Sequence, residues 1–165
     1  MFEIKDNFLD KEDFNKIQKV IFSNDFPWYY QAGITSKKDF KDKFYFTHKF
    51  YRDLDPQYTP GVSSDYFYLL KNFLIKIECK SIIRIKANLY LNQNKKQIHQ
   101  SHYDYSFLHK GCLLYLNDNN GLTYFGKKSV QPKANRVVFF HPNEEHSSSL
   151  CTDESRRVNI NFNYF

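Results

Sequence analysis

The chain has 165 residues, a formal net charge of +6, and aromatic side chains at 19% of its positions. This length fits one domain with a full core, and so many aromatic residues exclude an intrinsically disordered chain. The positive charge comes mostly from lysine, whereas arginine, the residue best suited to forked contacts with phosphate, is scarce. A nucleic-acid partner is therefore not favoured.

Cysteine usage and hydropathy indicate the compartment. Cys79, Cys112 and Cys151 are odd in number and show no CxxC spacing, which argues against a disulfide framework or a cysteine zinc site. No apolar leader follows Met1, and no run approaches the ~18 apolar residues that span a membrane. We expect a soluble cytoplasmic protein with free thiols and no membrane partner.

Two helices are expected in the first half of the chain, with Asp10 capping the first and Ser64 capping the second. Their apolar residues recur at helical spacing: Phe14, Ile17, Val20 and Ile21 in the first, and Tyr66, Leu70, Phe73, Leu74 and Ile77 in the second. Between the helices, residues 26–61 are expected to form an irregular, aromatic-rich region.

From residue 81 onward the sequence is typical of β-strands. Strands are expected at residues 82–91, 111–116, 122–125, 136–140 and 157–165. Residues 117–121 suggest a hairpin turn that joins the second of these strands to the third. Two helices followed by many strands indicate a mainly β sandwich or barrel with helices on one sheet. We expect a single domain over residues 1–165, with a helical part at about 1–80 and a β core at about 81–165.

A metal site is suggested by three side chains. His102 and Asp104 are two residues apart, so in a strand both would point to one face and converge on one ion. His146 follows the strand at 136–140 after a short turn and is the expected third ligand, with His141 as its rival. Two histidines and one carboxylate form the facial triad of non-haem iron oxygenases. We expect His48, His99 and His109 to be surface or packing residues.

The last strand has one polar face and one apolar face. Alternation places Arg157, Asn159 and Asn161 on the polar face, while the neighbouring Arg156 should point the opposite way with the apolar set. A barrel that encloses a polar ligand would have such a strand. 2-Oxoglutarate is such a ligand, because its keto-acid end can chelate iron and its distal carboxylate needs a cation and a donor. We expect Arg157 and the Tyr115 hydroxyl to supply them.

Several motifs occur in an order that resembles one family. They are Asn88-Leu89-Tyr90, His102-Tyr103-Asp104, Leu114-Tyr115-Leu116-Asn117, Asn120-Gly121-Leu122-Thr123-Tyr124-Phe125, Arg136-Val137-Val138-Phe139-Phe140, His146 and Arg157. Together they resemble the 2-oxoglutarate and Fe(II)-dependent oxygenase superfamily, and within it the prolyl 4-hydroxylase-like group with its small bacterial and phage members. The resemblance covers residues 82–165 and reaches residues 2–9 and 26–30.

The resemblance implies a double-stranded β-helix, or jelly roll, with the amino-terminal helices packed on one sheet. It also implies a dioxygenase that hydroxylates a substrate C–H bond and converts 2-oxoglutarate to succinate, with Fe(II) as the metal and ascorbate as a candidate reductant. Tyr90, Asn88 and Thr123 join the expected cosubstrate site on the same basis. Asn120 departs from the family pattern, because it stands where the turn motif has its first glycine.

The sequence says less about the substrate, for which a small molecule and a peptidyl proline are both candidates. Trp28, Tyr29 and Tyr30 could line the mouth of the site and stack on a ring, or could simply pack against the β core. Arg84 could meet an anionic substrate together with Lys86, the alternative being exposed charges on a sheet face. A nucleobase-directed oxygenase and a cupin-like binding domain without oxygenase activity remain alternatives. The sequence does not determine the oligomeric state.

Overall fold

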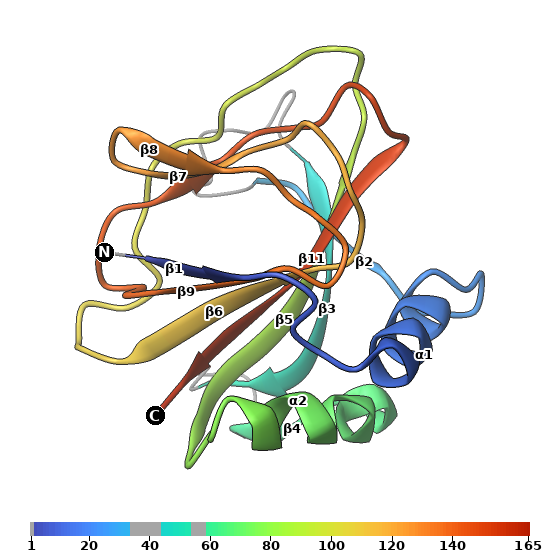
Figure 1. Cartoon of the computed structure of the whole chain (residues 1–165), viewed down its shortest axis with the longest axis vertical. Helices are drawn as coiled ribbons and strands as arrows, with labels where there is room; N and C mark the ends of the chain where they lie inside the picture. The colour runs from blue at the N-terminus through green and yellow to red at the C-terminus, as the bar shows by residue number, and fades with distance from the viewer. Residues whose placement is uncertain (1, 34–43, 54–58) are drawn as a thin grey trace.

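The computed structural model describes residues 2–33, 44–53 and 59–165, and within these ranges the chain forms two β-sheets and two helices (Figure 1). The larger sheet has the strand order β1-β9-β6-β11-β5-β3-β2, with β4 paired to β3, and all of its pairings are antiparallel. Its strands are β1 (Glu3–Lys5), β2 (Tyr29–Gln31), β3 (Tyr45–Arg52), β4 (Gly61–Val62), β5 (Ile82–Leu91), β6 (Lys110–Tyr115), β9 (Val137–Phe140) and β11 (Arg156–Tyr164).

A smaller sheet faces the large one. It has the order β10-β7-β8 and consists of β7 (Thr123–Phe125), β8 (Lys128–Val130) and β10 (Ser147–Ser148). Figure 1 shows the small sheet on one side of the large sheet and the helices on the other. This mainly antiparallel β-fold with two helices is consistent with a jelly roll, as the sequence predicted.

Both expected helices are present. Helix α1 (Lys11–Ile21) begins directly after Asp10, although the Asp10 side chain makes no capping hydrogen bond. The second helical segment begins at Ser64, whose hydroxyl accepts a hydrogen bond from the Tyr66 amide. It starts as a 3-10 helix (Asp65–Leu70) and continues as α2 (Lys71–Lys76).

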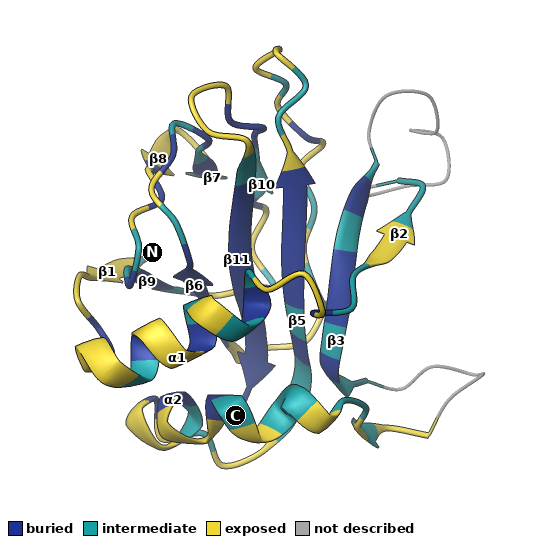
Figure 2. Ribbon diagram, turned by 90° about the vertical axis from the view of Figure 1, so that its right-hand side faces the viewer, coloured by how far each residue is buried: buried dark blue, intermediate teal, exposed yellow. Residues whose placement is uncertain are grey.

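The main core lies between these helices and the large sheet. Val158, Ile160 and Phe162 alternate along β11 and point into this core, as predicted. Phe73 of α2 stacks on Phe162, with ring centroids 4.2 Å apart. In Figure 2 the central strands are dark blue, whereas the outer faces of the helices are exposed. The opposite, polar face of β11 is thereby directed toward the small sheet.

The expectation of an irregular region at residues 26–61 was wrong where the structure describes it. This region contains β2, β3 and β4, and β3 pairs with β5 inside the large sheet. Residues 34–43 and 54–58 of the region lie outside the described ranges. The boundary expected near residue 81 therefore does not separate helices from strands. Aromatic residues on both faces of β3 hide the alternation that would have identified a strand.

The predicted hairpin between β6 and β7 was also wrong. These strands lie in different sheets, and the connection between them crosses from one sheet to the other. The Asn117 side chain explains this path, because it bonds the backbone of β11 at Arg156 and Val158. Asn120 in turn holds the loop at Thr152. These side-chain hydrogen bonds take the place of the backbone pairing that a hairpin between β6 and β7 would have made.

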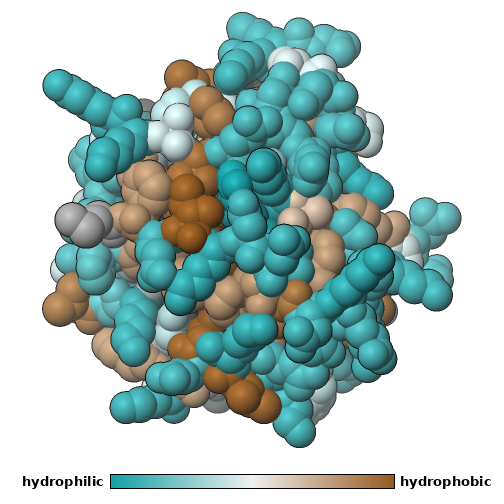
Figure 3. All heavy atoms as spheres, in the orientation of Figure 1, coloured by the Kyte–Doolittle hydropathy of each residue, from teal (hydrophilic) through white to brown (hydrophobic). Residues whose placement is uncertain are grey.

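The three cysteines are free, as expected. Within the described ranges, no helix is long and apolar enough to cross a membrane. On the face shown in Figure 3, hydrophilic side chains predominate, and separate apolar patches lie between them.

Candidate metal and cosubstrate site

A narrow cavity of about 60 Å³ opens between the two sheets. It is lined mainly by polar side chains: Tyr45, Lys86, Asn88, Tyr90, His102, Asp104, Leu113, Thr123, His146, Ser147, Ser148, Arg157, Asn159 and Asn161. Most of the residues expected in the metal and cosubstrate sites are in this set. The cavity is therefore the candidate functional site.

His102 and His146 are joined by their backbones. The His102 amide donates to the His146 carbonyl over 2.9 Å, and the His146 amide donates back to the His102 carbonyl over 2.9 Å. This isolated bridge brings the two imidazole rings to a centroid distance of 4.6 Å. Residues 44 positions apart in the sequence thus present two ring nitrogens to one point.

Asp104 reaches the same point from an irregular segment rather than from the regular strand that the sequence suggested. Its amide donates to the Pro142 carbonyl over 2.8 Å, which fixes its backbone. Its Oδ2 accepts from the Asn161 amide over 3.1 Å, and its Oδ1 lies 2.9 Å from Nη2 of Arg84. The carboxylate is therefore held from both sides.

One ligand atom from each of His102, Asp104 and His146 lies within 4.8 Å of the others, and we call these three residues the triad. The spacing suits one ion bound by two nitrogens and one oxygen. Burial, reinforced by His146, lowers the pKa of His102 against the opposing effect of Asp104, which favours the neutral imidazole that binds metal. His141 is exposed and lies outside this group.

Arg157 lies at the other end of the cavity, and only 1% of its surface is exposed. Its Nη2 donates to the Thr123 hydroxyl over 2.7 Å, and its Nη1 donates to the Ser149 carbonyl over 3.4 Å. Its Nε has no hydrogen-bond partner among the described residues. The Tyr115 hydroxyl also donates to Thr123, over 2.7 Å. Within the described ranges, no carboxylate lies within 4 Å of this buried guanidinium.

Tyr90 and Asn88 form the wall beside Arg157, as the register of β5 against β11 requires. The Tyr90 ring lies 5.5 Å from the Arg157 guanidinium. Asn88 donates to Asn159 over 2.9 Å, while its buried Oδ1 has no hydrogen-bond partner in the part of the chain that the structure describes. These groups leave unsatisfied polar atoms beside the cavity, as a site for a polar ligand would.

Arg156 points away from this site, as expected. Its guanidinium lies 4.4 Å from the centre of the Phe22 ring, on the helix side of the sheet. His48, His99 and His109 are each 3% exposed and hydrogen-bonded, so they are packing residues.

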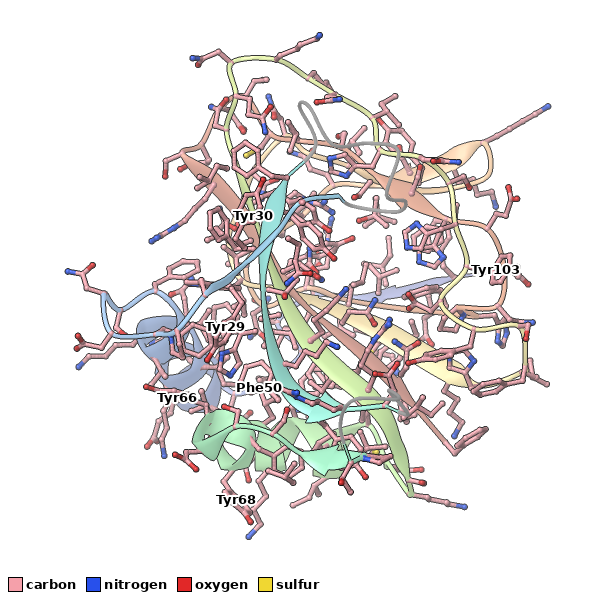
Figure 4. The ribbon with its side chains drawn as sticks, turned by 180° about the vertical axis from the view of Figure 1, so that it is seen from behind. Tyr29, Tyr30, Phe50, Tyr66, Tyr68 and Tyr103 are labelled. Carbon is pink, nitrogen blue, oxygen red and sulfur yellow. The ribbon has the colours of Figure 1, made fainter. Side chains whose placement is uncertain are left out.

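The aromatic cluster expected at the mouth does not come together there. Trp28 packs against the main core, and Tyr30 lies opposite Phe46 on the helix side of β3. Tyr29 is 59% exposed at the sheet edge. Figure 4 shows Tyr29 and Tyr30 on the opposite side of the molecule from Tyr103, which neighbours the metal ligands in sequence. The alternative of packing therefore holds for Trp28, whereas Tyr30, like Tyr29, is 59% exposed.

Arg84 is not an exposed sheet-face charge. Its side chain is 15% exposed, pairs with Asp104, and lies over the Tyr105 ring at 5.2 Å. The sequence analysis missed Tyr45, which stacks on Tyr90 with centroids 5.4 Å apart and ring planes 11° apart. His99 also stacks on Tyr90, with ring centroids 5.2 Å apart. Recognition of β3 would have found Tyr45, because it places Tyr45 near β5.

Known proteins resemble this chain in fold but not in sequence. No protein-family model and no curated protein matches the sequence. Among solved structures, a 2OG-Fe(II) oxygenase family oxidoreductase from Burkholderia pseudomallei matches 99% of this chain and 84% of its own, with a TM-score of 0.73 and 10% identity. A prolyl-4-hydroxylase from Pseudomonas putida matches 99% of this chain and 91% of its own, with a TM-score of 0.62 and 12% identity.

A third similar structure is a prolyl hydroxylase from Trichoplax adhaerens, solved with a peptide fragment of the hypoxia-inducible factor oxygen degradation domain. It matches 99% of this chain and 83% of its own, with a TM-score of 0.64 and 12% identity. This chain therefore has the fold of the 2-oxoglutarate and Fe(II)-dependent oxygenases, including prolyl 4-hydroxylases, as the sequence resemblance implied.

Proposed function

We propose that this protein is a 2-oxoglutarate- and Fe(II)-dependent dioxygenase that hydroxylates a substrate C–H bond and releases succinate. His102, Asp104 and His146 would hold the iron. Arg157 would bind the distal carboxylate of 2-oxoglutarate, beside Tyr115, Thr123 and the Tyr90–Asn88 wall. The fold and the grouping of the triad support this function.

The buried guanidinium of Arg157 is the observation that carries the proposal. A fully buried cation without a carboxylate partner is costly, so its site is built for an anion that arrives from outside the chain. A cupin-like binding domain would explain the triad, but it would leave this cation unexplained. A dicarboxylate that chelates the metal at one end and meets Arg157 at the other explains both features.

The hydroxyl groups near Arg157 are arranged to assist. Thr123 accepts hydrogen bonds from both Tyr115 and Arg157, so its own hydroxyl hydrogen remains available to a bound carboxylate. Burial raises the pKa of Tyr115 although the charge of Arg157 opposes this, so its phenol stays protonated and donates to Thr123. The rings of Tyr45 and Tyr90 cover the cavity wall and would limit access of water to the metal end.

When bound, Fe(II) and 2-oxoglutarate supply the oxidising chemistry, with dioxygen as the oxidant. The chain itself fixes the ligand geometry, binds the distal carboxylate and excludes water. A peptidyl proline is one candidate substrate, because two of the similar structures are prolyl hydroxylases. Ascorbate is a candidate reductant for keeping the iron ferrous.

Succinate formation from 2-oxoglutarate tests the proposal directly. The wild-type protein should form succinate under air when Fe(II) is present, and His102→Ala should not. Equal succinate formation by both proteins would contradict the assignment. Binding of DNA or RNA that weakens with salt, together with nucleobase-stimulated turnover, would instead favour a nucleobase-directed oxygenase.

A further inference from the structure

Lys86 stands in the cavity wall at the level of the metal ligands. It lies on β5 directly opposite Asn161, whose side-chain amide holds Asp104. On its other side it lies opposite Lys49 of β3. Its side chain lines the same cavity as the triad. Lys86 is therefore close to the place where a substrate would meet the metal.

The Lys86 ammonium makes few polar contacts with the described residues. The Tyr45 hydroxyl lies 3.5 Å from Nζ, and the centre of the Tyr45 ring lies 5.5 Å away. No carboxylate within those ranges lies within 4 Å of Nζ. Burial, together with the charges of Arg84 and Lys49, lowers the pKa of Lys86 to about 7 against the opposing effects of Asp104 and Asp53. An anion beside Nζ would stabilise the charged form.

Lys86 is also the cavity cation that the proposed site leaves without an anion. Arg84 pairs with Asp104, and Arg157 would meet the distal carboxylate of 2-oxoglutarate. Fe(II) contributes two positive charges and 2-oxoglutarate contributes two negative charges, so their binding leaves the net charge of the cavity unchanged. Among the described residues, Lys86 is therefore a cavity cation with no carboxylate within 4 Å.

Further basic residues lie on the strand next to Lys86. Lys49 of β3 is paired with Lys86. Lys49 and Arg52 also line a hollow of about 390 Å³ on the other side of β3. In Figure 2, β3 stands next to β5 toward the edge formed by β2. Positive side chains near the cavity attract anionic molecules.

We propose that Lys86 binds a carboxylate of the substrate, so that the molecule oxidised at this site is an organic acid. This inference rests on the proposed function, because it assumes that the metal and 2-oxoglutarate occupy the same cavity. Lys86 would orient the substrate by a charge-assisted hydrogen bond, and the reacting carbon would lie near the metal. A free acid fits this requirement, as does a peptide with an acidic side chain near the reacting residue.

Acetate is a suitable probe because it carries only the proposed recognition element. With Mn(II) in place of iron and 2-oxoglutarate bound, the metal shortens the proton relaxation times of any small molecule beside it. The acetate methyl protons should relax faster with the wild-type protein than with Lys86→Met, because affinity falls about tenfold on loss of the charged hydrogen bond. Acetamide should show little effect with either protein. Lys86→Arg should retain acetate binding, and Lys95→Met, at an exposed lysine, serves as the matched control.

Each outcome decides the proposal. Equal relaxation of acetate and acetamide with the wild-type protein would overturn it, as would unchanged acetate binding by Lys86→Met. Weakened 2-oxoglutarate binding by Lys86→Met, in place of weakened acetate binding, would assign Lys86 to the cosubstrate and also overturn it. Failure of the wild-type protein to bind Mn(II) and 2-oxoglutarate would overturn the proposed function as well, so the two failures are distinguishable.

Discussion

Arg84 and Asp104 form an ion pair of 2.9 Å in which both side chains are largely buried. Burial alone would raise the pKa of Asp104, but Arg84, with smaller effects of His146 and Lys86, holds it well below its usual range. The carboxylate is therefore ionised at neutral pH. Because Asn161 holds its other oxygen, its orientation is set before a metal binds.

Arg84→Met should weaken Fe(II) binding by about 10- to 100-fold, as loss of a group that orients a metal ligand typically does. The measurement is competition with a chelator of known affinity under anaerobic conditions. Arg84→Lys, which keeps the charge and replaces the planar guanidinium by an ammonium, should give an intermediate affinity. Unchanged or tighter metal binding by Arg84→Met would show that Arg84 does not orient Asp104.

Gly121 has no side chain, and the Arg157 side chain occupies the space beside it. A Cβ atom at this position would lie 2.8 Å from Cδ of Arg157 and 3.0 Å from the Ser149 carbonyl oxygen. Gly121→Ala should therefore lower the free energy of unfolding by about 1–3 kcal/mol and weaken 2-oxoglutarate binding. Calorimetric titration and urea denaturation measure the two effects.

Gly126→Ala is the control for this prediction. Gly126 has a φ of +59° at an exposed turn, so alanine strains the backbone there without contacting Arg157. This variant should lose stability and keep its 2-oxoglutarate affinity. A parallel loss of affinity in both glycine variants would mean that destabilisation alone explains the effect.

Thr123→Val keeps the shape of the side chain and removes the oxygen that accepts from both Tyr115 and Arg157. Two buried donors then lose a partner, so the free energy of unfolding should fall by about 1–3 kcal/mol. Urea denaturation measures this, with Thr123→Ser as the variant that restores the hydroxyl. If valine were as stable as threonine, the hydrogen bonds to Thr123 would contribute nothing to the folded state.

His48 should make the stability of the metal-free protein depend on pH. Burial lowers its pKa in the folded state, although its bond to the Pro27 carbonyl opposes this effect. The unfolded chain then binds a proton at a higher pH, near 6.5, than the folded chain does. The contribution of His48 to the free energy of unfolding is therefore present above that pH and is lost as the pH falls below it.

The free energy of unfolding should therefore be lower at about pH 5.5 than at about pH 7.5. His48→Phe should reduce this difference, whereas His141→Asn, at an exposed histidine, should retain it. Urea denaturation at both pH values provides the comparison. An equal pH dependence in wild type and His48→Phe would assign the effect to other groups.

Local patterns predicted much of the second half of the chain. β5 spans the residues expected, and the alternation of Arg157 and Asn159 with Val158 and Ile160 correctly divided β11 between cavity and core. Such patterns work because one face of the strand is buried in apolar surroundings and the other lines a polar cavity. The grouping of His102, Asp104 and His146 followed from residue type and order.

Long-range pairing explains what the sequence did not predict. Nothing local in Tyr45 indicates that it will stack on Tyr90, because the contact depends on the pairing of β3 with β5. The course of the chain after β6 likewise depends on the Asn117 side chain, which bonds the backbone of β11. Arg84 resembled a surface charge because its partner, Asp104, lies 20 residues away in an irregular segment.

Anaerobic titration with Fe(II) and 2-oxoglutarate, followed by the visible absorption of an iron-bound keto acid, tests the assembled site most directly. The wild-type protein should bind one iron and one 2-oxoglutarate and show the absorption band. His102→Ala should lose the band, and Arg157→Met should keep the iron while binding 2-oxoglutarate about 100-fold more weakly. No band with the wild-type protein, or an equal band with Arg157→Met, would contradict a site in which the triad and Arg157 bind opposite ends of one molecule.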